Sequence, residues 1–130
     1  MYSTADATQL VATKTQTAQY DVDQGVRRIP TIQSVPYLDV VSAVNDTGAK
    51  LRLFCVNRNL TDEIRATIRL AGFKAASARG QQLTAPDLYS INDDAQPEAI
   101  VPTPVNVSVG AGEFRHTFPP RSVTVIELSR

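Results

Sequence analysis

Two stretches of the sequence decide the fold: VPYLDVV at residues 35–41 and LRLFCVNRN at residues 51–59. Between Tyr37 and Val44, and again between Leu51 and Asn57, apolar side chains fall on both alternating positions, so neither strand has a polar face. NDTG at residues 45–48 joins them with residues that tolerate positive φ, which predicts a hairpin turn. We therefore predict two antiparallel strands covered on both sides, by long loops or by another domain.

The rest of the N-terminal half also reads as β structure. Residues 10–20 are poor in core residues and predict an exposed or edge strand. Residues 63–70 alternate between polar and apolar, which favours a strand over a short helix that would begin at Thr61. Residues 74–83 predict a weaker strand, which Gly80 would break.

The C-terminal half adds turns and further strands. Residues 85–88 predict a turn or one helical turn, and residues 93–104, with three prolines, predict an extended surface segment. Alternation predicts strands at residues 105–109 and 113–118, with a turn at Gly110-Ala111-Gly112, and an apolar run predicts a last strand at residues 122–128. Short strands at intervals of about ten residues indicate an all-β fold, an antiparallel β-sandwich that is jelly-roll-like, with at most one short helical turn. We predict one domain over residues 1–130, with residues 1–9 flexible.

Composition excludes several classes of partner. Of 130 residues, thirteen are basic and thirteen acidic, so we expect no nucleic acid and no acidic membrane as partner. Arg27-Arg28, the densest basic point, is interpreted as a solvated loop pair. No apolar stretch approaches about 18 residues and no signal pattern opens the chain, which predicts a cytoplasmic protein. The Asn-X-Ser/Thr matches at Asn45, Asn59 and Asn106 are therefore given no role.

Few residues could carry chemistry. Cys55 lies alone in an apolar run and is interpreted as a buried hydrophobic residue, not a nucleophile. His116 shares a strand face with Phe114 and Phe118, and we interpret it as packed at the core edge, without the nucleophile and carboxylate that a general base requires. One His and one Cys cannot build a zinc site, and a strand instead of a helix follows Gly110-Ala111-Gly112, unlike a phosphate loop. We predict no catalytic residue, no metal and no cofactor.

The carboxylates and aromatic residues are equally uninformative. A glycosidase needs two carboxylates roughly 5 to 10 Å apart, but Asp62-Glu63 and Asp93-Asp94 are interpreted as solvated turn residues. Carbohydrate-binding sandwiches present flat aromatic rings, Trp above all, that stack on sugars. The sequence has no Trp, and its tyrosines are scattered at Tyr2, Tyr20, Tyr37 and Tyr89, so direct carbohydrate binding is not expected.

Several motifs, taken in order, resemble one known family. They are Tyr20-Asp21 ahead of VPYLD at residues 35–39, the turn at residues 83–88, Ile91-Asn92 followed by Pro97 and Val101-Pro102, and the ending FPPRSVTVIEL at residues 118–128. Single motifs are common among sandwich domains, but their order and spacing are fairly specific. Over residues 10–130 the chain resembles the C-terminal accessory domain of the α-L-arabinofuranosidases of glycoside hydrolase family 51.

The resemblance implies a non-catalytic sandwich that packs on a catalytic β/α barrel and stabilises it. The whole enzymes are retaining hydrolases that release terminal L-arabinofuranosyl residues from arabinan, arabinoxylan and related oligosaccharides. Their acid/base glutamate stands in an Asn-Glu pair, and no such pair occurs here. Bacterial members are often intracellular and oligomeric, so the implied partners are the barrel and further copies of the enzyme. In such enzymes the N-terminal end can add a strand to this sandwich.

Two alternatives stay open at this point. The chain could be a free-standing carbohydrate-binding module, or the equivalent sandwich of another glycoside hydrolase family. Met1 stands where the family lies mid-enzyme, which suggests a truncated protein or a misread gene start.

Overall fold

The computed structural model describes residues 6–23, 30–110 and 112–130. Within these ranges the chain forms ten strands and no helix, which confirms the all-β class. The strands are β1 (Gln9–Val11), β2 (Gln19–Val22), β3 (Ile32–Pro36), β4 (Leu38–Val44), β5 (Lys50–Asn57), β6 (Ile64–Arg69), β7 (Ser77–Leu83), β8 (Thr103–Val105), β9 (Glu113–Phe118) and β10 (Ser122–Ser129).

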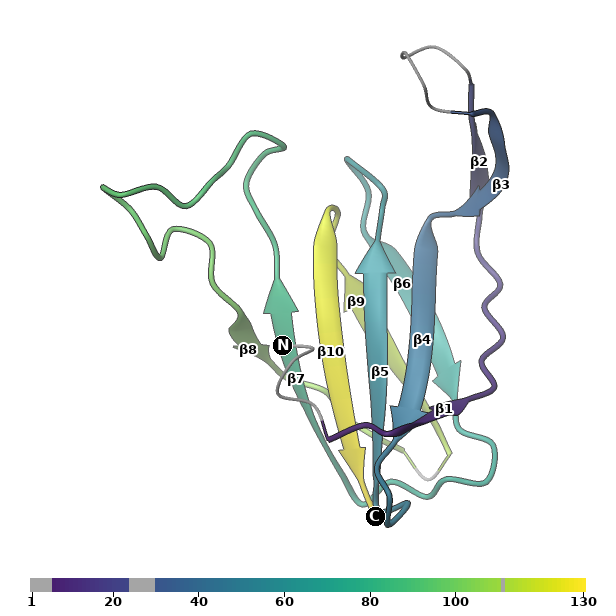
Figure 1. Cartoon of the computed structure of the whole chain (residues 1–130). Helices are drawn as coiled ribbons and strands as arrows, with labels where there is room; N and C mark the ends of the chain where they lie inside the picture. The colour runs from purple at the N-terminus through teal and green to yellow at the C-terminus, as the bar shows by residue number, and fades with distance from the viewer. Residues whose placement is uncertain (1–5, 24–29, 111) are drawn as a thin grey trace.

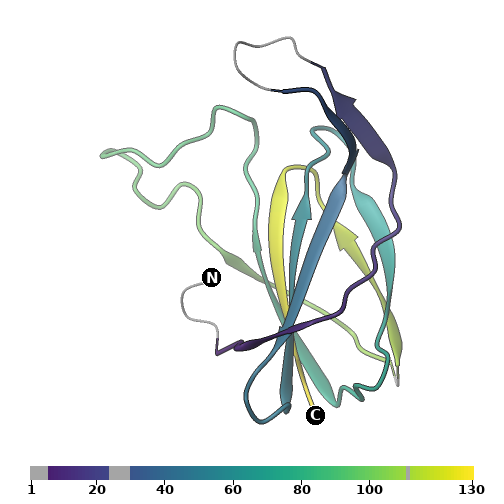
Figure 2. The same ribbon diagram turned by 45° about the vertical axis from the view of Figure 1, so that its right-hand side comes forward.

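The strands pair antiparallel in three sheets. The largest contains six strands in the order β1-β4-β5-β10-β7-β8, and the other two are the pairs β2-β3 and β6-β9. In Figure 1 the β6-β9 pair lies behind the six-stranded sheet, so two layers form the predicted sandwich. The layers are unequal, whereas a regular jelly roll divides eight strands between two sheets. The β2-β3 hairpin extends past one end of the layers, beyond the start of β4 (Figures 1 and 2).

The hairpin predicted from residues 35–59 forms the centre of the large sheet. β4 and β5 pair without interruption from Leu38 opposite Asn57 to Val44 opposite Leu51, and β10 covers the other edge of β5 along its full length. The turn closes as its residues predict, because Gly48 has a φ of 66° and donates its N–H to the carbonyl oxygen of Asn45 at 2.9 Å. The two-sided apolar pattern thus belongs to central strands.

The core lies between the two layers. The side chains that form it are Leu38, Leu51, Leu53, Cys55, Phe73, Phe114, Phe118, Ile126 and Leu128. Ile64, Ala66 and Ile68 of β6 pack against this cluster, which confirms the strand and the inward face predicted from alternation. Burying a large apolar side chain stabilises by roughly 1.5–3 kcal/mol, so this cluster holds the layers together.

The sequence predictions were wrong in several places. Residues 10–20 do not form one strand, because only the short β1 and β2 pair there, while residues 12–18 run without strand pairing. β3 was not predicted at all. Gly80 does not break β7: it lies inside the strand, where a side chain would meet Val105 at 2.7 Å, so the glycine permits close strand approach. Residues 106–109 are not a strand, and β8 ends at Val105.

Other predictions were confirmed or lie partly outside the described residues. Residues 85–88 form a bend and turn without a helix, and β9 and β10 form as expected. The turn at Gly110-Ala111-Gly112 includes residue 111, and the flexible segment predicted at residues 1–9 includes residues 1–5, both outside the described ranges. Thr8 donates its backbone N–H to Val44 at 2.9 Å, and Gln9 begins β1.

The edge strands of the two layers differ in their residues. Within the described residues, no third strand pairs with the β6-β9 layer, and Arg65, Thr67 and Arg69 alternate along the solvent face of β6. At the far side of the large sheet, the edge strand β8 contains Pro104. The described part of the chain contains no helix of the length and apolarity needed to span a bilayer.

Candidate docking surfaces

His116 lies on β9 at the edge of the core, as its pattern predicts. Its ring packs edge-on against Phe118, with 4.8 Å between ring centroids and 70° between the ring planes. Burial lowers the pKa of His116 below its usual value. The Nε2 atom is buried and, within the described residues, has no hydrogen-bond partner. The ring therefore lacks the paired nucleophile and carboxylate of a catalytic triad in this part of the chain.

Cys55 is buried in the middle of β5, where only 1% of its surface is exposed. Burial raises the pKa of its thiol to about 12. A thiol that stays protonated and inaccessible is a poor nucleophile, so the interpretation of Cys55 as a packed hydrophobic residue is confirmed.

The two carboxylate pairs lie on different loops and serve local structure. The Asp62 backbone N–H donates to Asn59 Oδ1 at 2.9 Å, and Glu63 forms an ion pair with Arg65 at 2.7 Å. Asp93 Oδ1 accepts the backbone N–H groups of Ala95 and Gln96 at 2.9 and 2.7 Å, which closes a tight turn. These bonds are those of turn residues. Among the described residues no group of three or more His, Cys, Asp or Glu side chains is arranged to hold a metal ion.

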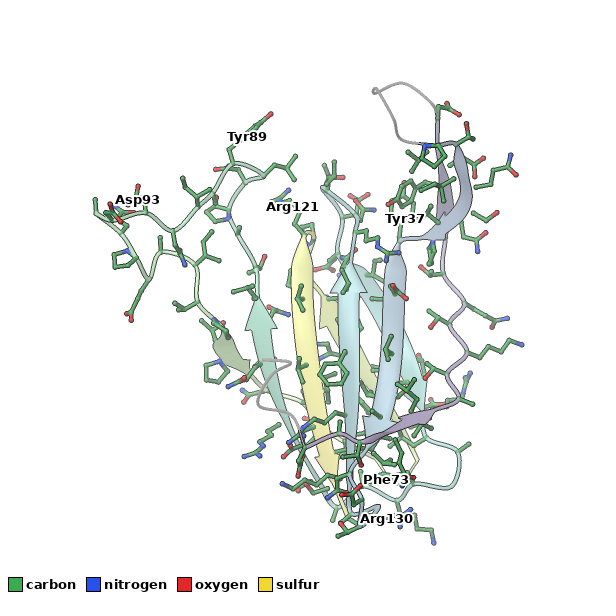
Figure 3. All side chains as sticks on the ribbon, in the orientation of Figure 1. Tyr37, Phe73, Tyr89, Asp93, Arg121 and Arg130 are labelled. Atoms are coloured by element: carbon green, nitrogen blue, oxygen red, sulfur yellow. The ribbon has the colours of Figure 1, made fainter. Side chains whose placement is uncertain are left out.

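The tyrosines form no common platform in the described structure. Tyr20 and Tyr37 stack on each other, with 4.7 Å between ring centroids and 36° between planes, and both are half-buried. Tyr89 is 88% exposed on a distant loop (Figure 3), and Tyr2 lies outside the described residues. Each accessible ring thus stands apart from the others.

The outer face of the six-stranded sheet carries an apolar groove. It has a volume of about 400 Å³ and is lined by Ala7, Leu10, Asp39, Val41, Ala43, Phe54 and Val56. Val41 is 48% exposed and Leu10 is 81% exposed, while Phe54 beneath them is only 8% exposed. The sequence predicted apolar side chains on this face, and the structure leaves part of them uncovered. An apolar face in this state is typical of a contact surface.

A charged cluster borders one end of this outer face. Glu127 accepts hydrogen bonds from Arg52 Nε and Arg79 Nε, both at 2.8 Å, and its side chain is 8% exposed. Burial alone would raise the pKa of Glu127, but the hydrogen bonds from the two arginines leave it below its usual value. Asp6 pairs with Arg52 from the N-terminal side. The outer face therefore has an apolar middle, and at one end its acidic and basic side chains are paired with each other.

A long loop between β7 and β8, residues 84–102, projects from the sandwich and is here called the arm (Figures 1 and 2). Four large apolar side chains on it are exposed to solvent: Leu88 by 62%, Tyr89 by 88%, Ile91 by 69% and Val101 by 42%. They are four of the nine exposed large hydrophobic residues in the described part of the chain. The sequence predicted a surface segment here, but gave no reason to expect an apolar one.

Arg121 ties the base of the arm to the neighbouring loops. It sits in the turn between β9 and β10 with a φ of 52°, a conformation that is rare outside glycine. One guanidinium nitrogen donates to the carbonyl oxygen of Leu60 and the other to that of Pro86 at 2.9 Å. Figure 3 places Arg121 between the arm and the top of β10. Sequence reasoning missed this residue, because its partners are backbone atoms in distant segments.

A polar hollow of about 590 Å³ lies on the β6-β9 layer. It is lined by Arg65, Ala66, Thr67, Asn106, Arg115, His116 and Thr117. Arg115 is exposed and, in the described part of the chain, makes no hydrogen bond or ion pair. No residue of the arm lines this hollow in its own chain. Arg65 is already paired with Glu63, so Arg115 is the uncompensated positive charge of the hollow in the described structure.

Comparisons with known proteins agree with this arrangement. The family described as the alpha-L-arabinofuranosidase C-terminal domain matches residues 1–122. An alpha-L-arabinofuranosidase from Thermotoga maritima, solved with arabinose, is 30% identical with a TM-score of 0.84, over 93% of this chain and 26% of that one. The thermostable GH51 enzyme from Thermotoga petrophila RKU-1 is 30% identical with a TM-score of 0.81, over 91% of this chain and 25% of that one. No curated protein sequence matches this chain.

More distant structures share the fold. The GH51 arabinofuranosidase from Xanthomonas axonopodis pv. citri is 22% identical with a TM-score of 0.73, over 88% of this chain and 22% of that one. This chain spans about a quarter of the length of the two Thermotoga enzymes, and its described residues form strands and loops without a helix, so the catalytic barrel is not part of them. Fold, size and family match agree: the chain belongs to the family of alpha-L-arabinofuranosidase C-terminal domains.

Proposed function

We propose that this chain is the accessory domain of a retaining α-L-arabinofuranosidase that hydrolyses terminal α-L-arabinofuranosyl residues of arabinan and arabinoxylan. In that enzyme it packs on the catalytic β/α barrel and stabilises it, without contributing a catalytic group. The family match and the local structural roles of His116, Cys55 and the paired carboxylates support this role. The chain alone should therefore release no product from an aryl α-L-arabinofuranoside, and measurable hydrolysis by the purified chain would overturn the proposal.

The observation that carries the proposed packing is the uncovered apolar groove on the outer face of the large sheet. Val41 and Leu10 are exposed there above the nearly buried Phe54. The N-terminal segment lines this same groove through Ala7 and Leu10. In a C-terminal domain the rest of the polypeptide is attached at the N-terminal side, so the tether holds the barrel near this face at high effective concentration. Covering the groove would then stabilise the contact between the domain and the barrel by about 25 cal/mol per Å² of apolar surface removed from water.

A substitution in the groove tests this packing. Val41→Lys should leave the unfolding of the isolated chain nearly unchanged, because Val41 is half exposed there. In the full-length enzyme the same change should lower the apparent melting temperature by several degrees, because a lysine would be buried against the barrel without a partner. Ile32→Lys is the matched control, since Ile32 is 46% exposed on the β2-β3 hairpin, away from the groove. Equal melting temperatures for both full-length variants would contradict the proposed contact.

A free-standing carbohydrate-binding module remains the competing function. Among the described residues, the exposed ring of Tyr89 is the feature that favours it. Titration of the chain with arabino-oligosaccharides separates the two functions, because saturable binding that Tyr89→Ala abolishes would support the module. We expect no binding, since a single ring gives little stacking surface.

The proposal includes two further properties of the whole enzyme. We propose that it is cytoplasmic, because the one cysteine of this chain lies buried in the core without a disulfide partner. We also propose that the domain contributes to a homo-oligomer, which light scattering of the full-length enzyme would test. Cell fractionation with an antibody to the chain would test the location.

A further inference from the structure

The arm combines exposed apolar side chains with a one-sided charge. Asp87, Asp93, Asp94 and Glu98 lie in residues 84–102, and no Lys or Arg does. The remaining sequence holds thirteen basic residues against nine acidic ones, a formal net charge of +4 beside −4 on the arm. An acidic arm on an otherwise basic chain favours contact between the arm of one copy and a basic surface of another.

The arm is ordered by its own hydrogen bonds, although it projects into solvent. Asn92 Nδ2 donates to the carbonyl oxygen of Ile100 at 3.0 Å, and Ile100 N–H donates to Asn92 Oδ1 at 2.7 Å, so one side chain closes the loop. Asp93 caps the turn near the tip, and Arg121 fixes the base at Pro86. A loop held in place before binding loses little conformational entropy when a partner covers its apolar side chains.

The hollow on the β6-β9 layer offers the positive charge that would complement the acidic arm. Arg115 is exposed and has no partner among the described residues, and Arg65 beside it is engaged only with Glu63. The hollow lies on the layer opposite the apolar groove, so a barrel over the groove leaves it free. The arm in turn leaves the sandwich from the β7-β8 side, whereas the groove lies over β4 and β5 (Figure 1).

We propose that the arm of one chain docks into the β6-β9 hollow of a second copy, with Asp94 and Glu98 against Arg115, while Leu88 and Ile91 lie against the rim. A pair related by a two-fold axis would use each arm and each hollow once. The inference rests on the proposed function in two ways, because it specifies a contact for the proposed homo-oligomer and it leaves the outer groove to the barrel. Because the contact area is small, we expect weak association of the chain alone, with a Kd on the order of 10 µM.

Sedimentation of the full 130-residue chain over a wide concentration range tests the contact. Asp94→Lys should weaken association about tenfold, because it places like charges together, and Arg115→Glu should do the same. The matched controls are Asp23→Lys and Lys74→Glu, which make the same charge changes at exposed residues outside the arm and the hollow. Association should also weaken from about 0.1 M to about 1 M salt, where charges are screened beyond about 3 Å.

A mixture of two variants gives the decisive result. Asp94→Lys mixed with Arg115→Glu should associate at least as tightly as the unmodified chain, because the lysine arm of one then meets the glutamate hollow of the other. The mixture of the two control variants should show no gain over the unmodified chain. A chain that stays monomeric at all concentrations, or a mixture that fails to restore association, would overturn the inference. Neither result bears on the Val41→Lys test of barrel packing, so the two proposals can fail separately.

Discussion

Replacing Asn57 by aspartate changes one group in the interior and leaves the shape of the side chain the same. Asn57 is 1% exposed at the end of β5. Its Nδ2 faces the carbonyl oxygens of Pro119, Phe118 and Asp62 at 2.8, 3.0 and 3.2 Å, and its Oδ1 accepts the Asn59 N–H at 2.9 Å. In the Asn57→Asp variant a carboxylate oxygen would replace the donor and point at three acceptors.

The expected cost follows from these contacts. The variant loses the hydrogen bonds that Nδ2 donates, each with a net value of about 1 kcal/mol, and it leaves a buried charge against carbonyl dipoles. We therefore expect the free energy of unfolding to fall by at least about 4 kcal/mol at pH 7. The same environment raises the pKa of the new carboxyl above that in the unfolded chain. The folded state then binds more protons between those two pKa values, so the variant loses stability as pH rises through that window.

Urea unfolding followed by tyrosine fluorescence or circular dichroism, at pH 7 and near pH 4, measures both effects. The difference in free energy of unfolding between the native protein and the variant should shrink near pH 4. Asn106→Asp is the control, because Asn106 is exposed and should change stability by less than about 0.5 kcal/mol. If Asn57→Asp costs no more than the control, or if its cost is the same at both pH values, the reasoning about the buried donor is refuted.

Three further predictions concern single residues. His116 has a lowered pKa in the folded state, so stability should fall as pH falls from about 6.5 towards that lower pKa, and thermal unfolding of a His116→Phe variant should lose this dependence. Gly80→Ala should cost about 1–3 kcal/mol in urea unfolding, since the new methyl group would lie 2.7 Å from Val105 Cγ2, and adding Val105→Ala should restore part of it; strict additivity would argue against a clash. Cys55, with a thiol pKa of about 12, should not react with a thiol reagent until urea unfolds the protein, and rapid labelling of the native chain would contradict its burial.

The central strands and the fold class were predictable because their signals are local. The apolar pattern of residues 37–44 and 51–57 and the turn chemistry of Asn45 to Gly48 depend only on near neighbours in sequence, and β4 and β5 formed as predicted. The alternation of residues 63–70 specified β6 for the same reason. When one face of a strand must be buried, an apolar period of two residues determines which side chains point into the core.

The remaining features depend on contacts between distant segments. Gly80 was expected to break a strand, but its role is set by Val105 of the neighbouring β8. Asn57 was read only as the end of an apolar strand, and its carbonyl partners at Phe118 and Pro119 lie about sixty residues away. The solvent exposure of Leu88 and Ile91 could not be predicted, because turn residues surround them and no sequence pattern distinguishes an exposed leucine from a buried one. The expectation of no histidine or carboxylate site was argued from residue counts and local sequence context, and it stays a prediction.

The open edges of the sandwich also determine how the chain behaves at high concentration. A strand with unpaired backbone groups is a template for intermolecular β-sheet, and such pairing leads to insoluble aggregates. The β6 edge carries Arg65 and Arg69, and the β8 edge carries Pro104, which has no N–H to donate. Charge and proline at these two positions oppose the pairing of further copies along β6 and β8, while the apolar groove on the outer face is uncovered.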